Sequence, residues 1–115
     1  MESAPALELL AALAHDSRLA VFRLLVQAGP EGLPAGAIAQ SLDIAPPTLS
    51  FHLGQLANAG LLRSRRLGRS IVYAADYEAM RALVGYLYEN CCGASGCAPV
   101  PAEPPASQRA ARRNS

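Results

Sequence analysis

The three cysteines of this 115-residue chain lie close together, at Cys91, Cys92 and Cys97. A trans peptide holds neighbouring Cα atoms about 3.8 Å apart, whereas an unstrained disulfide needs roughly 4.4 to 6.8 Å. Cys91 and Cys92 are therefore expected to remain thiols. Glycines at positions 93 and 96 let the intervening chain fold back and bring Cys97 near the pair. Three thiolates that converge in this way would bind a soft cation.

The same three thiols permit other chemistry. In a redox sensor, Cys97 would pair with one of the two adjacent cysteines after oxidation. Zinc could bind three thiolates and a water, but structural zinc usually takes four protein ligands. A third interpretation is that the cysteines belong to a frayed chain end without a function. That interpretation would leave the adjacent pair and the glycines beside it as a coincidence. We therefore favour a binding site for a soft cation.

The length and composition of the chain predict one small domain, since 115 residues leave little room for a second core. Hydrophobic residues make up 51% of the chain but aromatic residues only 5%, which suits helix packing and a partner subunit that completes a thin core. No basic patch opens the chain, and no stretch approaches the roughly 18 apolar residues of a membrane span. We therefore expect a cytoplasmic protein, in which free thiols stay reduced.

Five helices are expected to position the cysteines. Apolar residues recur at helical spacing in five segments, at residues 5–14, 16–28, 33–42, 46–58 and 76–90. In the first segment, the predicted buried face consists of Leu7, Leu10 and Leu13. In the fourth segment it consists of Leu49, Leu53 and Leu56.

The ends of these helices are predicted from capping and breaking residues. Asp16 and Asp76 can each accept a hydrogen bond from the first turn of the second and the fifth helix. Pro34 fits the first turn of the third helix, because its missing N–H would have no partner there. Ala45 is a weak cap for the fourth helix, and Gly60 can adopt a positive φ just beyond its end.

A short turn and a β-hairpin complete the predicted fold. Residues 43–45 join the third and fourth helices, as in a helix-turn-helix. β-prone segments at 61–66 and 71–75 flank a glycine-containing turn and predict a hairpin, the wing of a winged helix. The expected fold is mainly α with this small hairpin, and one domain over residues 1–97 includes the thiol site. Residues 98–115 are rich in Pro, Ala and Ser and are expected to be disordered.

Polar side chains of the fourth helix are expected to contact DNA. Thr48, Ser50, His52 and Gln55 lie off the leucine stripe and can donate or accept hydrogen bonds at base edges in the major groove. The alternative is that they form the solvated face of a surface helix. Phe51 is expected to pack against a neighbouring helix instead.

Four arginines give the predicted hairpin a local positive charge, although the net charge of the whole chain is only +1. They are Arg63, Arg65, Arg66 and Arg69, and no acidic residue lies among them. Charged residues can also protect an edge strand from aggregation, but Glu or Lys would do that equally well. We expect contacts to phosphates or to the minor groove, and a strong salt dependence of binding.

Two segments resemble the ArsR/SmtB family of arsenical-resistance repressors, namely LDIAPPTLSFHL at residues 42–53 and AGLL at residues 59–62. The Gly68-Arg69 turn and Tyr73 fit the same pattern, and the resemblance covers residues 5 to 90. It implies a homodimeric winged helix, paired through its first and last helices, that represses an operon until a toxic metal or metalloid binds. It also implies that the protein is not an enzyme.

The departures from this family narrow the expected effector. A common arsenic site of the family places cysteines on the third helix, where this chain has Pro34, Gly36 and Ala39. The zinc-sensing members carry histidines on the last helix, whereas His15 and His52 lie far upstream here. The remaining C-terminal cysteines are similar to those of members that bind trivalent arsenic or antimony within one subunit. The resemblance thus implies As(III) or Sb(III) as effector, with no cofactor required.

A mechanism of release follows from helix geometry. Adjacent residues of a helix point about 100° apart, so Cys91 and Cys92 could not face one ion if the last helix continued through them. Ion binding is therefore expected to unwind the end of that helix and to change the spacing of the two DNA-contacting helices. Outside the repressor class, the alternatives are a small thiol-dependent arsenate reductase and a metalloid chaperone. No Cys-x-x-Cys motif or phosphate-binding glycine motif supports them.

Overall fold

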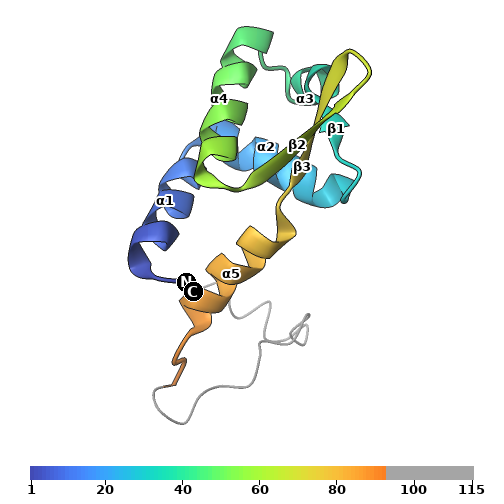
Figure 1. The fold of residues 1–115 in the computed structure, drawn as a ribbon. Coiled ribbons are helices and arrows are strands. Elements are labelled where there is room, and N and C mark those ends of the chain that lie inside the picture. The colour runs from blue at the N-terminus through green and yellow to red at the C-terminus, as the bar shows by residue number, and fades with distance from the viewer. Residues whose placement is uncertain (93–115) are drawn as a thin grey trace, which may run out of the picture.

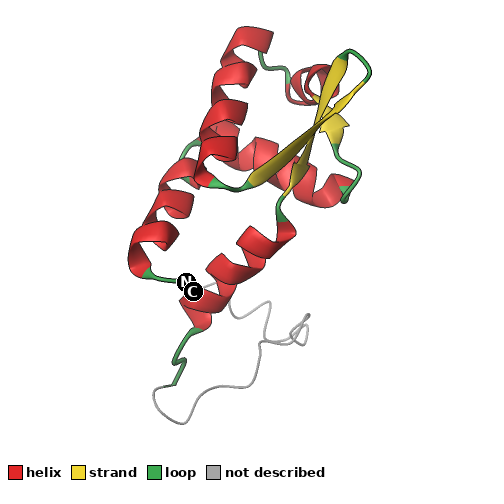
Figure 2. Ribbon diagram, viewed as in Figure 1, coloured by secondary structure: helices red, strands yellow, loops and turns green. Residues whose placement is uncertain are grey.

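The computed structural model describes residues 1–92, which form five helices and a three-stranded sheet (Figures 1 and 2). The elements in chain order are α1 (Ser3–Leu13), α2 (Asp16–Ala28), β1 (Leu33–Pro34), α3 (Ala35–Leu42), α4 (Pro46–Ala59), β2 (Leu62–Leu67), β3 (Ser70–Ala75) and α5 (Tyr77–Tyr88). This order confirms the predicted winged helix-turn-helix. The predicted disordered tail, residues 98–115, lies outside the described residues.

The core is built around α4, which packs against α1, α2, α3 and β2. The leucine stripe predicted for α4 is confirmed, since Leu49, Leu53 and Leu56 are almost completely buried. Leu25 of α2 and Ile38 of α3 are buried with them. Each such side chain contributes about 1.5 to 3 kcal/mol of burial free energy, so this contact fixes α4 relative to the rest of the domain.

The buried face of α1 differs from the predicted one. Ala6 and Leu9 are buried, whereas Leu7 and Leu10 are exposed and Leu13 is only partly covered. The spacing of three residues was read correctly, but the helix presents the small Ala6 and its neighbour Leu9 to the core. Leu7 and Leu10 instead lie on a side of α1 that residues 1–92 leave open.

The helix caps are confirmed in one case and corrected in another. Asp76 caps α5, because its Oδ1 accepts a hydrogen bond from the Ala79 N–H at 3.0 Å. The cap of α2 is His15 rather than Asp16, since His15 is extended and its Nδ1 accepts from the Ser17 N–H at 3.1 Å. Asp16 lies in the first turn of α2, where its negative charge interacts favourably with the positive end of the helix dipole.

A short strand replaces the predicted start of the third helix. Leu33 and Pro34 pair antiparallel with Tyr73 and Val72, which makes β1 an edge strand of a sheet in the order β1-β3-β2. The missing N–H of Pro34 is tolerated at an edge, where no further strand needs it. The third helix therefore begins only at Ala35.

Gly32 allows β1 to approach β3 closely, and its replacement should destabilise the fold. Its φ is +75°, and a Cβ at this position would run into the backbone carbonyl oxygen of Tyr73. We expect Gly32→Ala to lower the free energy of unfolding by more than about 3 kcal/mol, from backbone strain together with the clash. Urea denaturation followed by circular dichroism would measure this change.

The matched control is Gly29→Ala. Gly29 also has a positive φ, +93°, but open space surrounds the position of its missing Cβ. Backbone strain alone should cost roughly 1 to 3 kcal/mol there, because a φ of +93° with a ψ of 178° lies in a region that is nearly restricted to glycine. Equal losses in the two variants would contradict the close approach of β1 to β3.

The elements place the two candidate regions, the polar helix with the hairpin and the chain after α5, at opposite ends of the molecule. The N-terminal end of α4 and the tip of the β2–β3 hairpin lie together at one end, and the start of α1 and the end of α5 lie at the other (Figure 1). Gly68, with a φ of +64°, forms the tight hairpin turn. Among the described residues, no helix is long and apolar enough to cross a membrane.

Candidate nucleic-acid interface and thiol site

Three of the four polar residues predicted on the DNA-contacting helix are exposed on α4. Thr48, Ser50 and Gln55 all face solvent, while the leucine stripe holds the opposite side of α4 in the core. Their hydroxyl and amide groups can form hydrogen bonds with base edges. The structure thus leaves these three side chains available to DNA, as the predicted role requires.

His52 does not belong to this exposed set, which corrects the prediction that it contacts DNA. Its side chain is only 5% exposed, and its Nδ1 is buried without a hydrogen-bond partner. The ring lies against that of His15, with centroids 4.7 Å apart. The spacing of His52 from Leu49 and Leu56, three and four residues, places it on the buried side of α4, and this signal was present in the sequence.

The prediction that Phe51 packs against a neighbouring helix is also wrong. Its side chain is 59% exposed on α4. Phe51 follows Leu49 by two residues and therefore points to nearly the opposite side of the helix. Among the described residues, the aromatic ring that Phe51 contacts is that of His52, and the two ring centroids lie 5.8 Å apart.

The burial of His52 predicts a loss of stability in mild acid. Desolvation lowers the pKa of His52 below 6.5, and the charges of His15 and Arg18 lower it further. Below about pH 6.5 the unfolded chain therefore takes up a proton that the folded chain refuses, so the free energy of unfolding falls as the pH falls. Urea denaturation between pH 7.5 and 5 should show this decline in the wild-type protein and a weaker one in His52→Gln.

The control for this prediction is His15→Asn, which keeps a side-chain oxygen able to cap α2. This variant should retain most of the pH dependence, because burial of His52 is the largest cause of its shift. If His52→Gln and the wild-type protein lost stability equally between the two pH values, His52 would not be the titrating group.

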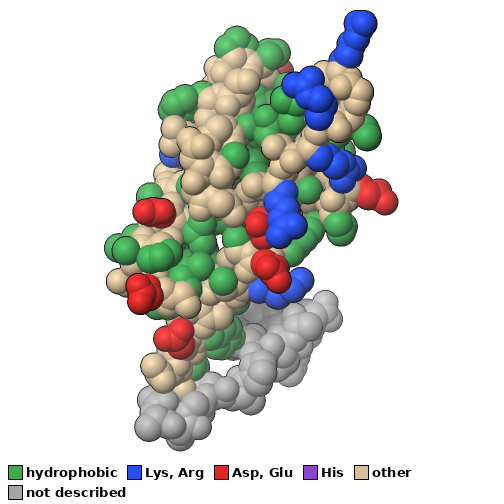
Figure 3. Space-filling view, viewed as in Figure 1, with side chains coloured by type: hydrophobic (Ala, Val, Ile, Leu, Met, Phe, Trp, Pro, Cys, Tyr) green, Lys and Arg blue, Asp and Glu red, His purple; other side chains and the backbone are tan. Residues whose placement is uncertain are grey.

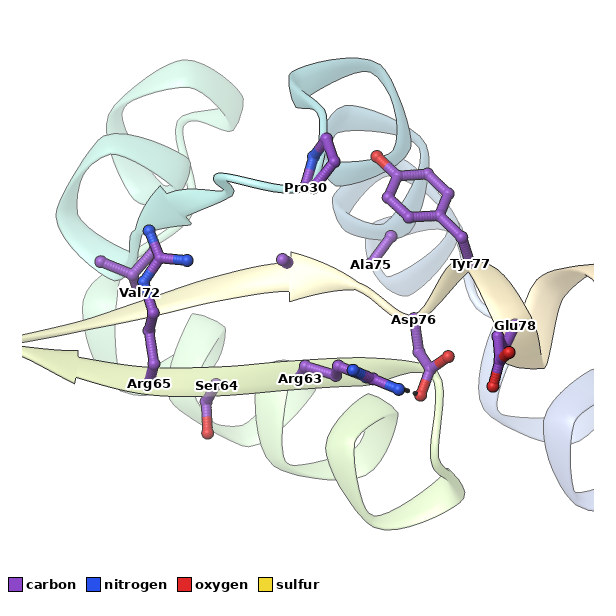
Figure 4. A pocket seen from close by; sticks show the side chains of 10 residues that line it. Pro30, Arg63, Ser64, Arg65, Val72, Ala75, Asp76, Tyr77 and Glu78 are labelled. Atoms are coloured by element: carbon purple, nitrogen blue, oxygen red, sulfur yellow. Dashed lines mark hydrogen bonds and ion pairs between the residues drawn. The ribbon is translucent and has the colours of Figure 1, made fainter.

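Two of the predicted wing arginines are held by contacts within the protein. Arg63 Nε lies 3.3 Å from Asp76 Oδ2, and Arg65 donates to the backbone oxygen of Glu31 at 3.0 Å. In Figure 4, Arg65 crosses β3 toward the loop that carries Pro30, whereas Ser64 points to the other side of the hairpin. Asp76 therefore partly offsets the charge of Arg63, whereas Arg65 donates to an uncharged backbone oxygen and its own charge is not offset by that contact.

Asp76 links the wing to α5. Its pKa is lowered first by the hydrogen bond from the Ala79 backbone N–H and also by Arg63, against an opposing effect of burial. Arg63 and Asp76 line an open hollow of about 580 Å³ between the hairpin and the start of α5. Tyr77 closes another side of it and donates its hydroxyl to the Val26 carbonyl at 2.9 Å. The base of the wing is therefore tied to both α2 and α5.

Arg66 and Arg69 lie nearer the hairpin tip, and both are exposed. In the space-filling view, basic side chains follow the hairpin from its tip toward α5. Acidic side chains lie over α1 and also beside the middle and lower part of this basic row, but not at the tip (Figure 3). The hairpin tip therefore carries a local positive charge despite the small net charge of the chain.

The predicted thiol site begins just beyond α5. The helix ends at Tyr88, and Asn90 and Cys92 adopt positive φ values of 59° and 61°. Cys91 Sγ and Cys92 Sγ lie 3.8 Å apart, and Cys91 is half-buried. The expectation that ion binding must unwind the helix is therefore wrong, because the cysteines already lie outside α5 and their sulfurs already face each other.

The third predicted ligand, Cys97, lies outside the described residues. Within residues 1–92, no group of three or more His, Cys, Asp or Glu side chains is arranged to hold a metal ion. The structure thus shows the adjacent pair of the predicted site and leaves the complete triad as a prediction.

Comparisons with known proteins agree with this architecture. A family model described as a helix-turn-helix domain matches residues 13–65. The chain is 36% identical over 84 residues to the biofilm growth-associated repressor of Agrobacterium fabrum, covering 73% of this chain and 69% of that protein. It is 30% identical over 84 residues to the HTH-type transcriptional regulator YgaV of Escherichia coli, covering 73% of this chain and 83% of that protein.

Solved structures extend the similarity to the whole fold. An ArsR-like transcriptional regulator from Rhodococcus sp. RHA1 superimposes with a TM-score of 0.65 at 26% identity, over 73% of this chain and 76% of that one. The homodimeric winged helix-turn-helix DNA-binding domain of Mb0332 from Mycobacterium bovis gives a TM-score of 0.62 at 26% identity, over 72% and 75%. The chain belongs to the ArsR-like family of winged helix-turn-helix transcriptional regulators.

Proposed function

We propose that this protein is a transcriptional repressor that binds operator DNA as a homodimer and releases it when As(III) or Sb(III) binds to Cys91, Cys92 and Cys97. The observation that carries the effector site is the 3.8 Å separation of the Cys91 and Cys92 sulfurs beyond the end of α5. No cofactor takes part in this proposal.

The DNA side of the proposal rests on α4 and the hairpin. Thr48, Ser50 and Gln55 present hydrogen-bonding groups on one element, and the wing arginines supply positive charge beside it (Figure 3). A helix with polar groups suits the major groove, while arginines suit phosphates or a narrow minor groove. A repressor role agrees with the name of the Agrobacterium relative.

The dimer rests on apolar side chains that the single subunit leaves exposed. Leu7 and Leu10 of α1 and Val84 and Leu87 of α5 are all exposed, and α1 contacts α5. These helices meet at the end of the molecule opposite the hairpin tip (Figure 1). Two copies joined there would direct two α4 helices toward successive half-sites, which lie about 34 to 36 Å apart on DNA. The Mb0332 domain is a homodimer of the same fold.

The sulfur geometry suits a shared ion. A thiolate sulfur lies about 2.3 Å from a bound metal such as zinc, so two sulfurs on one ion of that size can be at most about 4.6 Å apart. The Cys91 and Cys92 sulfurs, at 3.8 Å, already satisfy this limit. Soft ions prefer thiolates to the oxygen ligands that water offers. In the proposed complex, Cys97 supplies the third thiolate to the ion that the reduced Cys91 and Cys92 share.

Release of DNA follows from the position of the thiols next to the proposed dimer helix. Cys91 follows Leu87 by only four residues, so a ligand that fixes the chain after α5 alters how that helix meets its partner. Such a change would shift the spacing of the two α4 helices. Linkage requires that DNA weaken metalloid binding by the same factor by which metalloid weakens DNA binding.

The test is a DNA-binding titration with the reduced protein and the upstream region of its own gene. We expect binding without effector and release on addition of arsenite or antimonite, but not of zinc at equal concentration. Release by peroxide without any response to arsenite would instead identify a redox sensor. A protein that does not bind its upstream region would contradict the repressor role itself.

A further inference from the structure

Phe51 occupies the middle of a row of exposed side chains on α4. Residues three and four apart on a helix are neighbours on its surface, so Thr48, Phe51 and Gln55 lie one after another along α4. All three are exposed, and Phe51 is the large apolar member. An aromatic ring thus stands between two hydrogen-bonding side chains on the element proposed to enter the major groove.

The Phe51 ring contacts the ring of its buried neighbour, His52. The Phe51 ring meets the His52 ring edge to face, at 5.8 Å and an interplanar angle of 63°. His52 is itself buried and lies against His15, which caps α2. A side chain oriented by a buried neighbour loses less conformational freedom when it binds a partner.

We propose that Phe51 contacts the 5-methyl group of thymine and selects thymine at one position of each half-site. The inference rests on the proposed DNA binding. The thymine methyl is an apolar group on the major-groove edge of the bases, and phenylalanine is among the residues that contact it. The polar neighbours Thr48 and Gln55 and the nearby wing arginines favour DNA over an apolar protein partner, because their groups complement base edges and phosphates.

The experiment uses the upstream region prepared in two forms, one with thymine and one with uracil at every thymine position, which removes only the 5-methyl groups. The wild-type protein should bind the uracil form about tenfold more weakly, from about 0.8 kcal/mol for one lost methyl contact in each of two half-sites. Phe51→Ala should bind the thymine form more weakly than wild type and should hardly distinguish the two forms.

Leu67→Ala is the matched control, since Leu67 is 61% exposed but lies on β2 at the hairpin tip. The methyl group is absent from the minor groove, so this variant should retain the wild-type preference for the thymine form. Circular dichroism would show that each variant folds. If Phe51→Ala kept the wild-type ratio between the two forms, the methyl contact would be excluded while DNA binding stood. If the wild-type protein bound neither form, the proposed function would fail instead.

Discussion

Replacing Cys91 and Cys92 together by Ser is expected to abolish the release of DNA by arsenite. Effector coupling of this kind typically changes affinity by about 5- to 150-fold, and the variant should lose all of it because serine hydroxyls do not bind soft ions as thiolates do. The measurement is the dissociation constant for the upstream region, by fluorescence anisotropy, with and without arsenite in reduced protein.

Affinity without arsenite should stay within about twofold of wild type in this variant. The two sulfurs lie beyond α5, far along the molecule from the N-terminal end of α4 and the hairpin tip (Figure 1). Asn90→Gly is the matched control, because glycine accepts the positive φ of 59° and leaves the thiols in place. Cys97→Ser tests the third ligand separately. Continued release by arsenite in the double serine variant would exclude this thiol site as the sensor.

Removing both arginines nearest the hairpin tip should have the largest effect on DNA binding itself. In Arg66→Ala with Arg69→Ala, a dimer loses four positive charges. Unlike Arg63 and Arg65, these two arginines make no ion pair or side-chain hydrogen bond within residues 1–92. We expect an affinity loss of about a hundredfold at 0.15 M salt and a decrease of about 2 to 4 in the slope of log affinity against log salt. A salt titration from 50 to 300 mM would measure both quantities.

Arg81→Ala is the control for a charge lost outside the hairpin, and it removes one positive charge per subunit where the wing variant removes two. Arg81 is exposed on α5, so its loss changes the net charge without removing a group from the hairpin. Its salt slope should remain close to that of wild type. If the decrease in slope per charge removed were the same in both variants, the contribution of the wing would be a general effect of net charge rather than phosphate contact.

The sequence was most informative where local chemistry and burial agree. The leucine stripe of α4, the Asp76 cap and the glycine turn of the hairpin are each decided by neighbours within a few residues. The polar face of α4 follows from the same stripe, because whatever lies opposite a buried row must face solvent. The same rule assigns His52 to the core, because it lies three residues after Leu49 and four before Leu56, whereas its chemistry beside polar residues favours a DNA contact.

Contacts between residues far apart in the sequence decided the strand β1 and the buried face of α1, which local patterns did not predict. Leu33 and Pro34 form a strand because β3, about forty positions later, offers them a partner, and no local propensity encodes that pairing. In α1, helical spacing predicted an apolar row, yet packing against the domain chose Ala6 and Leu9 for the core. The row of leucines left exposed is what points to a second subunit.

At the thiol site, the amino-acid sequence by itself determined which atoms are present, since three cysteines near one another define the available chemistry. The end of α5 at Tyr88 and the positive φ values of Asn90 and Cys92 were decided only in three dimensions. That backbone path turns two adjacent side chains toward each other, whereas a continued helix would have directed them about 100° apart. The sequence therefore determined that thiols are present, and the tertiary structure determined how close the Cys91 and Cys92 sulfurs lie to each other.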